Sequence, residues 1–251
     1  MLDLIDLCLK FHPDTVNEKV ALDHVSFHIE EGDFISVLGT NGAGKSTLLN
    51  TISGTLPLDS GHVVLDGKDI SKEAEYKRAR HIGRLFQDPL KGTAPNMTIE
   101  ENLGLAYSRG KRTTLSRAIK KQDRAIFQAK FAELNLGLEE RMHTNVGLLS
   151  GGQRQALTLL MATIVTPKLL LLDENTAALD PKTASQVMDV TDNIVKANHI
   201  TTLMITHNMK QALTYGNKTI ILNEGKIVKV LEGEERSRTT IEDLLNMYDF
   251  V

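Results

Sequence analysis

The spacing of apolar residues along the chain predicts a fold built from both strands and helices. Apolar and polar positions alternate over residues 2–10 and 20–30, which is typical of strands with one buried face. Residues 34–38 and 169–172 are unbroken apolar runs, which indicate strands buried on both faces. Strands of these kinds, separated by segments with helical spacing, are typical of an α/β protein.

The segment between residues 89 and 153 lacks this succession of strands. Thr98-Ile99-Glu100-Glu101 has the sequence of a capping box and predicts a helix that extends to about Tyr107. A longer amphipathic helix is predicted from Leu115 to Leu136. We therefore expect an inserted helical subdomain in a chain that otherwise alternates between strands and helices.

The apolar run at residues 34–38 leads into nine residues with the spacing G-x-x-x-x-G-K-[ST]. A strand before this pattern and a helix after it are the setting of a phosphate-binding loop, whereas a chance glycine-rich turn would lack them. The glycines let backbone N–H groups point at phosphate oxygens, Lys45 would bind the β- and γ-phosphates, and the Ser46 hydroxyl would bind Mg²⁺. The residues expected to bind the nucleotide here are Gly39, Asn41, Gly42, Ala43, Gly44, Lys45, Ser46 and Thr47.

Two acids follow the other buried run. Asp173 and Glu174 stand at the carboxyl end of the strand predicted for residues 169–172, where ligands bind in open α/β sheets. Asp173 is positioned to hold Mg²⁺ through water, and Glu174 is the natural base for a water that attacks a phosphate. The alternative is an acid pair with only an electrostatic role at a helix N-terminus. The phosphate loop earlier in the chain favours the metal ligand and the base.

Composition then narrows the class of protein. The chain has 251 residues and a formal net charge of −3, with a pI near 6.2, which argues against a protein that coats nucleic acid. The single cysteine, Cys8, cannot form an internal disulfide, which fits a reducing compartment. No apolar run approaches the roughly 20 residues needed to cross a bilayer. Any membrane step would therefore require another chain.

A third motif, Leu149-Ser150-Gly151-Gly152-Gln153, stands just before the acidic strand. Ser150 fits a helix N-cap, and the N–H groups of Gly151 and Gly152 would then be donors at a positive helix end. This is a second anion site, which one nucleotide cannot easily reach together with the phosphate loop of the same chain. In these motifs the sequence resembles the ATP-binding-cassette (ABC) ATPases, whose signature is Leu-Ser-Gly-Gly-Gln.

The resemblance implies roles for four further positions. Gln87 matches the glutamine that contacts Mg²⁺ and the attacking water, and His207 matches the histidine that hydrogen-bonds the γ-phosphate. Ala178-Leu179-Asp180 matches the loop that touches the opposite protomer. An aromatic residue near the N-terminus stacks on adenine in this family, and Phe11 is the candidate by position. The polar segment from Pro13 to Lys19 leaves a core role for Phe11 open.

The resemblance covers almost the whole chain and implies a single ABC ATPase domain. We expect a RecA-like phosphate-loop core with an antiparallel β-subdomain in residues 1–88 and 154–251, and a helical signature subdomain in residues 89–153. Two such domains would close head-to-tail around two ATP molecules. On one chain, catalysis and metal binding would rest on Lys45, Ser46, Gln87, Asp173, Glu174 and His207. The opposite chain would contribute Ser150, Gly151, Gly152, Gln153 and Asp180.

Among proteins with this domain, the ATPase subunit of a membrane transporter fits best. The stretch from Gln87 to Ser150 has no room for the coiled coil or zinc insert of DNA-maintenance members, and one set of motifs is present where ribosome-associated members carry two. The sequence resembles importer cassettes for amino acids. This resemblance implies that the chain works with permease subunits and with a substrate-binding protein outside the cell, and that it does not bind nucleic acid. It also implies a location at the cytoplasmic face of the membrane. The alternatives are a lipid, lipoprotein or antimicrobial-peptide export or extraction system, and a non-transport ATPase.

Basic residues dominate the stretch from Arg109 to Lys130, where Asp123 is the acid. Such a stretch is typical of a solvated helix face. It would also suit contact with anionic lipids of the cytoplasmic leaflet. Both interpretations stay open from the sequence.

Overall fold

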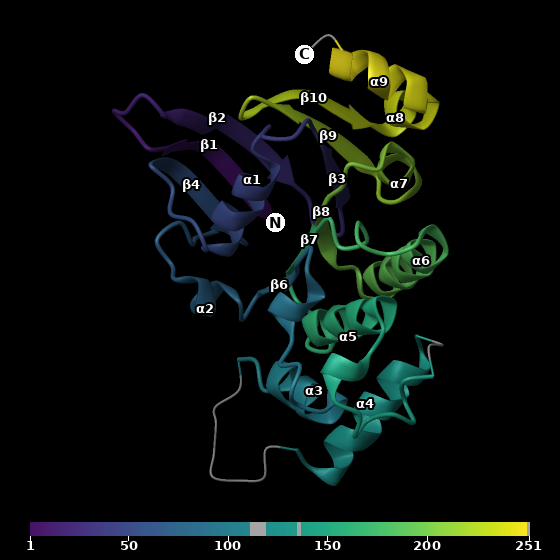
Figure 1. The fold of residues 1–251 in the computed structure, drawn as a ribbon. Helices are drawn as coiled ribbons and strands as arrows, with labels where there is room; N and C mark the ends of the chain where they lie inside the picture. Colours follow the sequence, from purple (N-terminus) through teal and green to yellow (C-terminus); the bar gives the residue numbers. More distant parts are fainter. Residues whose placement is uncertain (111–118, 135–136, 250–251) are drawn as a thin grey trace. The chain divides into compact units, whose positions relative to one another are not determined.

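The computed structural model describes residues 1–110, 119–134 and 137–249, and the chain divides into two compact units (Figure 1). The first unit comprises residues 1–82 and 199–251, and the second comprises residues 83–198. Each unit has a buried apolar cluster of its own. The subdomain boundaries expected after residues 88 and 153 stay a prediction.

The first unit contains an antiparallel sheet with the strand order β2-β1-β4-β5. Its strands are β1 (Leu2–Phe11), β2 (Lys19–Ile29), β4 (Ser60–Leu65) and β5 (Lys68–Asp69). β1 buries Leu2 and Leu4, then Leu7 and Leu9, and a register shift against β2 separates the two pairs. This switch from even to odd positions is the effect of a β-bulge, which adds one residue to a strand. The alternating strands expected at residues 2–10 and 20–30 are confirmed.

The first unit also holds four strands in the order β10-β9-β3-β8. They are β3 (Phe34–Leu38), β8 (Thr201–Ile205), β9 (Lys218–Asn223) and β10 (Lys226–Glu232). β3 pairs in parallel with β8 and β9, whereas β10 is antiparallel to β9. Every residue of β3 and of β8 is buried, as expected for apolar runs in the middle of a parallel sheet. The α/β class and the antiparallel subdomain are therefore confirmed.

Helices complete the first unit. They are α1 (Lys45–Ser53), α2 (Glu75–Arg78), α7 (Met209–Thr214), α8 (Gly233–Arg238) and α9 (Ile241–Asp249). Leu244 of α9 and Ala212 of α7 join Leu38 of β3 in one buried cluster. This packing buries the end of β3, the strand before the phosphate loop.

The second unit is mainly helical. In it β6 (Ile82–Leu85), which starts at the last residue of the first unit, lies next to β7 (Leu169–Asp173) in the strand order. The helices are α3 (Ile99–Tyr107), α4 (Lys121–Ala132), α5 (Gly151–Thr163) and α6 (Pro181–Asn198), with 3₁₀ turns η1 (Pro89–Gly92) and η2 (Val146–Leu148). Phe127 and Phe131 are fully buried among α3, α4 and α5, and Phe127 meets Tyr107 edge-on at 5.5 Å between ring centroids.

The two helices predicted for this unit differ in outcome. α3 begins after Thr98, whose hydroxyl accepts the Glu101 N–H while the Glu101 carboxylate accepts the Thr98 N–H, so the predicted capping box is confirmed. The helix predicted from Leu115 to Leu136 is shorter: residues 119 and 120 are not helical, and α4 starts at Lys121. The Asp123 carboxylate accepts the Lys120 N–H at 2.8 Å, which favours a helix start at this point. Residues 111–118 and 135–136 lie outside the described residues, and with them part of the basic stretch.

Candidate functional site

The phosphate loop connects β3 to α1 in the first unit, and two of its glycines are required by close backbone contacts. A Cβ atom on Gly39 would lie 2.2 Å from the Leu222 carbonyl oxygen, and one on Gly44 would lie 2.3 Å from the Ala21 carbonyl oxygen. Gly44 also has φ = 103°, a left-handed conformation that favours glycine. The Ala43 carbonyl accepts the Gly225 N–H at 2.9 Å, so the loop is joined to the β9–β10 turn.

The side chain of Lys45, the first residue of α1, folds back against this loop. Its side chain is only 7% exposed, and Nζ donates to the carbonyl oxygens of Gly39 (2.8 Å) and Thr40 (3.0 Å). Gly44, the N-cap of α1, has no side chain to cap the helix, and the first turn of α1 carries no acid. Positive charge and N–H donors therefore gather at the start of α1, where an anion would be stabilised. Ser46, in the first turn of α1, is exposed.

A hollow of about 810 Å³ lies on the phosphate loop within the first unit. Thr40, Asn41, Gly42 and Ala43 line it, together with Lys19 at the start of β2. The ammonium of Lys19 lies 3.0 Å from where a Cβ on Gly42 would stand. Lys19 is thus a cation at the loop that the sequence motifs did not reveal, because no motif links it to the loop.

Phe11 is the last residue of β1 and is only partly exposed. It pairs in register with Lys19, which lines the hollow, but Phe11 itself is not among the lining residues. Adenine stacking by Phe11 therefore stays a prediction.

His207 follows β8, the parallel neighbour of β3. Val37 of β3 is in register with Ile205 of β8, and the Thr206 N–H donates to the Val37 carbonyl at 3.3 Å. The phosphate loop and His207 thus leave adjacent strands at the same edge of the sheet. His207 is exposed, and Asn208 after it caps α7 by accepting the Gln211 N–H. The first unit brings the loop, Lys45, Ser46 and His207 to one place.

Asp173 and Glu174 belong to the second unit, where Asp173 ends β7. Nη2 of Arg84, on β6, donates to Oδ2 of Asp173 at 3.3 Å, and the two side chains are 11% and 14% exposed. The Arg84 guanidinium also lies over the Phe86 ring, 4.6 Å from its centroid, and Gln87 comes next in the chain. No sequence motif marks Arg84, although a charged residue inside a short apolar strand is a usable indication.

Glu174 adopts a left-handed backbone conformation with φ = 44°. Glutamate rarely adopts this conformation, which is disfavoured for residues with a Cβ. The turn that follows, in which the Ala177 N–H donates to the Glu174 carbonyl at 3.0 Å, holds this geometry. The side chain is partly exposed, so it can reach a water molecule.

The signature segment forms the N-terminus of α5. The Ser150 hydroxyl accepts the Gln153 N–H at 3.3 Å and the Gln153 carboxamide accepts the Ser150 N–H at 3.2 Å, so the predicted N-cap is confirmed as a capping box. Gly151 is exposed, but Gly152 is buried, and a Cβ there would lie 2.3 Å from Cγ2 of Thr183 in α6. Gly152 therefore also has a packing role.

Asp180 directly precedes α6, which begins at Pro181. Its carboxylate accepts the Thr183 N–H at 3.1 Å, and hydrogen bonds from Thr183 lower the pKa of Asp180. Asp180 is exposed and stays ionised at neutral pH.

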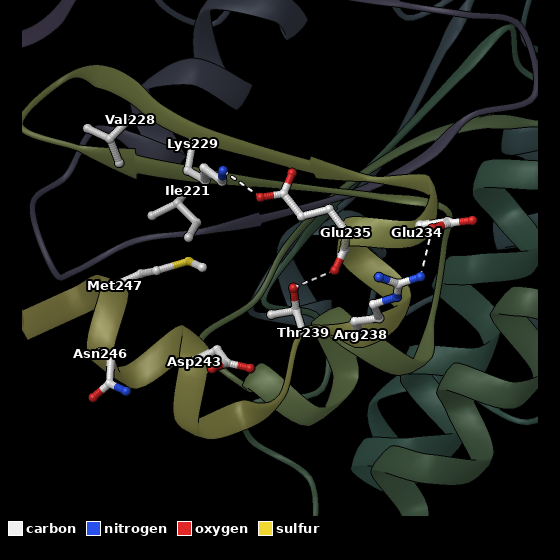
Figure 2. A pocket seen from close by; sticks show the side chains of 10 residues that line it. All are labelled: Ile221, Val228, Lys229, Glu234, Glu235, Arg238, Thr239, Asp243, Asn246 and Met247. Carbon is white, nitrogen blue, oxygen red and sulfur yellow. Dashed lines mark hydrogen bonds and ion pairs between the residues drawn. The ribbon is translucent and has the colours of Figure 1, made fainter.

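A second hollow, of about 940 Å³, lies between the β9–β10 hairpin and helices α8 and α9 (Figure 2). Ile221, Val228 and Met247 form its apolar part, and Lys229 pairs with Glu235 at its edge. None of the predicted nucleotide-binding residues lines it.

Among the described helices, none has the length and apolar character that crossing a bilayer would take.

Comparison with known proteins places this geometry in context. The sequence profile of the ABC transporter family matches residues 22–177, more than half of the chain. The tyrosine transport ATP-binding protein of Clostridioides difficile (strain R20291) is 44% identical over 238 residues, which cover 95% of this chain and 92% of that protein. The phosphonates import ATP-binding protein PhnC of Trichormus variabilis (strain ATCC 29413 / PCC 7937) is 34% identical over 209 residues, 82% of this chain and 84% of that protein. A solved dimeric structure, the post-hydrolysis state of the ATP-binding cassette MJ0796 bound to ADP and Pi, has a TM-score of 0.79 at 25% identity and covers 92% of this chain and 98% of that one.

Proposed function

Because this chain belongs to the ABC transporter family of ATPases, we propose that it powers the import of an amino acid or a similar small solute through separate permease subunits. ATP binding and a transport-coupled ATPase activity follow from the family itself. The observation that supports an amino-acid substrate is the 44% identity, over 95% of the chain, with a tyrosine transport ATP-binding protein. The phosphonate relative keeps other small solutes in the same proposal.

The first unit binds the triphosphate in this proposal. N–H groups of residues 39–44 and the ammonium of Lys45 surround the β- and γ-phosphates, and Lys45 exchanges its carbonyl partners for phosphate oxygens. His207, at the same sheet edge, hydrogen-bonds the γ-phosphate. Phe11 stacks on adenine. The low exposure of Lys45 strengthens its attraction to the phosphates, because solvent screens it little.

The second unit orients the attacking water. Glu174 accepts a proton from that water as it attacks the γ-phosphate, and the Gln87 side chain positions it. The hydroxyl of Ser46 and the carboxylate of Asp173 are hard oxygen donors of the type that Mg²⁺ prefers, so this donor set fits the ion. Mg²⁺ held by Ser46, Asp173 and Gln87 would neutralise charge on the β- and γ-phosphates.

A second copy of the chain completes each site in the proposal. Ser150, Gly151, Gly152 and Gln153 at the start of α5, with Asp180 before α6, face the ATP bound to the other copy. The exposed N-terminus of α5 suits an anion. The related cassette MJ0796 with ADP and Pi is dimeric, which supports this arrangement.

The permease partners place the chain at the cytoplasmic face of the cell membrane, with a substrate-binding protein on the outer side. The alternative is an ATPase of a lipid, lipoprotein or antimicrobial-peptide export or extraction system. Uptake of labelled tyrosine and other amino acids into proteoliposomes that contain this chain together with its permease subunits tests the direction and the substrate class. ATP-dependent uptake supports import, and ATP-dependent release of a lipid or peptide refutes it.

The dimer and the base are tested with Glu174→Gln. This variant keeps the shape of the side chain but cannot accept the proton, so we expect it to bind ATP, turn over very slowly and elute from gel filtration as an ATP-dependent dimer. The double variant Glu174→Gln/Lys45→Ala is the control, since it should stay monomeric with ATP. A Glu174→Gln protein with near-normal turnover contradicts the role of the base.

A further inference from the structure

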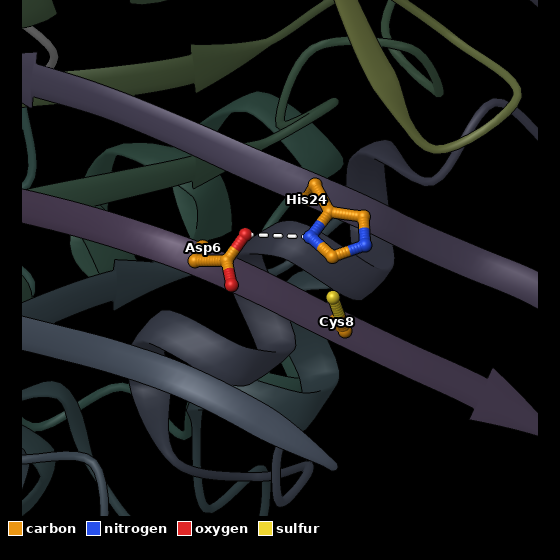
Figure 3. A group of neighbouring side chains, drawn as sticks. All are labelled: Asp6, Cys8 and His24. Atoms are coloured by element: carbon orange, nitrogen blue, oxygen red, sulfur yellow. Dashed lines mark hydrogen bonds and ion pairs between the residues drawn. The ribbon is translucent and has the colours of Figure 1, made fainter.

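Three different metal-ligating side chains meet on the antiparallel sheet of the first unit (Figure 3). Asp6 and Cys8 come from β1 and His24 comes from β2, and their ligand atoms all lie within 4.8 Å of one another. The His24 Nδ1 is 2.6 Å from Oδ1 of Asp6. None of the three has a part in the nucleotide chemistry described above.

The backbone brings these groups together through paired irregularities. Asp6 has φ = 54° and His24 has φ = 53°, so both are left-handed residues within strands. The register of β1 against β2 shifts between Leu4 and Leu7, around Asp6. The Asp6 N–H donates to the Ser26 hydroxyl at 2.9 Å, which ties the bulge to β2. The side chains are therefore held on two paired strands whose neighbouring residues Leu4, Leu7 and Val25 are buried.

We propose that Asp6, Cys8 and His24 form a binding site for a Zn²⁺-type divalent transition metal. Thiolate, imidazole and carboxylate are the ligands of zinc in proteins, whereas Mg²⁺ and Ca²⁺ prefer oxygen alone. A tetrahedral zinc with bonds of about 2.0 to 2.3 Å needs ligand atoms about 3.3 to 3.6 Å apart. The distances between these ligand atoms run from 2.6 Å to no more than 4.8 Å, and this interval includes the required spacing. A water molecule takes the fourth position.

Further charged groups lie next to His24. Asp23 has a carboxylate oxygen 3.8 Å from Nε2 of His24, and Lys226 is held 3.0 Å from the other Asp23 oxygen. Asp6 raises the pKa of His24, chiefly through their hydrogen bond, with Asp23 adding to the effect and Lys226 opposing it.

The same sheet contains natural controls. His28 pairs with Asp3 at 2.5 Å across β1 and β2, and His62 pairs with Asp69 at 2.8 Å. An aspartate–histidine contact by itself is therefore common on this surface, and it needs no metal. Cys8, the single cysteine of the chain, distinguishes the proposed site from the other two pairs.

The test uses the full-length protein without nucleotide or Mg²⁺, under a non-thiol reductant. Titration with Co²⁺ should give one equivalent bound, with thiolate-to-metal charge-transfer absorption in the near ultraviolet, and Zn²⁺ should displace it. Cys8→Ser should abolish that absorption, and His24→Asn should weaken binding at least about tenfold, whereas the control His28→Asn should leave both unchanged. Circular dichroism checks that each variant is folded.

Three results would overturn the proposal. One is a Zn²⁺ affinity that is the same in Cys8→Ser as in the unmodified protein, which would assign binding to scattered surface groups. Another is equal loss in His24→Asn and His28→Asn, which would show that aspartate–histidine pairs bind the metal without the thiol. Absence of Co²⁺ absorption at neutral pH refutes the site directly.

Discussion

Replacing Arg84 by methionine should destabilise the second unit, because it removes the guanidinium that pairs with the Asp173 carboxylate. At the observed 3.3 Å, a charge pair is worth about 5 kcal/mol at an effective dielectric constant of about 20. Desolvation of both groups offsets part of this attraction, and breaking a fully buried pair by removing one partner costs about 3 to 5 kcal/mol. The 11% and 14% exposure of the two side chains lets solvent reach the remaining carboxylate. We therefore expect a loss of about 2 to 3 kcal/mol in the free energy of unfolding.

Urea unfolding followed by circular dichroism measures this loss, and a double-mutant cycle assigns it to the pair. Methionine keeps an apolar side chain against the Phe86 ring, so lost packing contributes little. Asp173→Asn removes the charge of the acceptor at constant shape. The loss of unfolding free energy in the double variant should be smaller than the sum of the losses in the two single variants by about 1 kcal/mol or more. Additivity within about 0.5 kcal/mol would refute the pair as a source of stability.

Three further perturbations test other parts of the structure. Gly152→Ala would place a Cβ 2.3 Å from Cγ2 of Thr183, so it should lower the unfolding midpoint in urea, and Thr183→Ser, which removes that methyl group, should restore most of it. The pKa of Asp69 is lowered to about 2 from 3.8, first by the Ser71 hydroxyl and N–H and then by His62. Because the pKa of Asp69 is lower in the folded state, its ionised carboxylate stabilises the protein above about pH 4, and this stabilisation is lost as the pH falls toward about 2. Ser71→Ala should therefore show a shallower loss of stability over that pH range in acid titrations followed by circular dichroism. Lys45→Ala should lose most ATP affinity in equilibrium dialysis, whereas Lys91→Ala, an exposed lysine of η1, should not; unchanged affinity in Lys45→Ala would contradict the phosphate site.

Local sequence patterns were sufficient to predict the glycine-rich loop between β3 and α1 and the starts of α3 and α5. Glycine is required at positions 39 and 44 because a Cβ atom there would clash with the backbone carbonyl oxygens of Leu222 and Ala21. Ser150 and Thr98 were identifiable because a capping box involves residues only three positions apart. These features depend on neighbours in the chain, which a sequence displays directly.

Contacts that depend on strand order could not be predicted in the same way. Arg84 and Asp173 are 89 residues apart, and they meet only because β6 lies next to β7. Lys19 reaches the phosphate loop because β2 begins beside it, which no motif encodes. The left-handed conformation of Glu174 was equally hidden, since glutamate has no preference for it. These features arise from the tertiary arrangement within each unit.

The attachment of the phosphate loop to its surroundings affects how nucleotide binding energy is used. Ala43 is hydrogen-bonded to Gly225, which in turn accepts the Asp23 N–H at 2.9 Å, so β2 and the β9–β10 turn fix the loop from two sides. Ordering a flexible backbone costs about 1 to 2 kcal/mol per residue. Folding has already met that entropic cost for this loop, so the incoming nucleotide does not have to organise its own phosphate site. In the proposed head-to-tail dimer, its binding free energy would remain available for bringing a second copy of the chain onto the other side of the ATP.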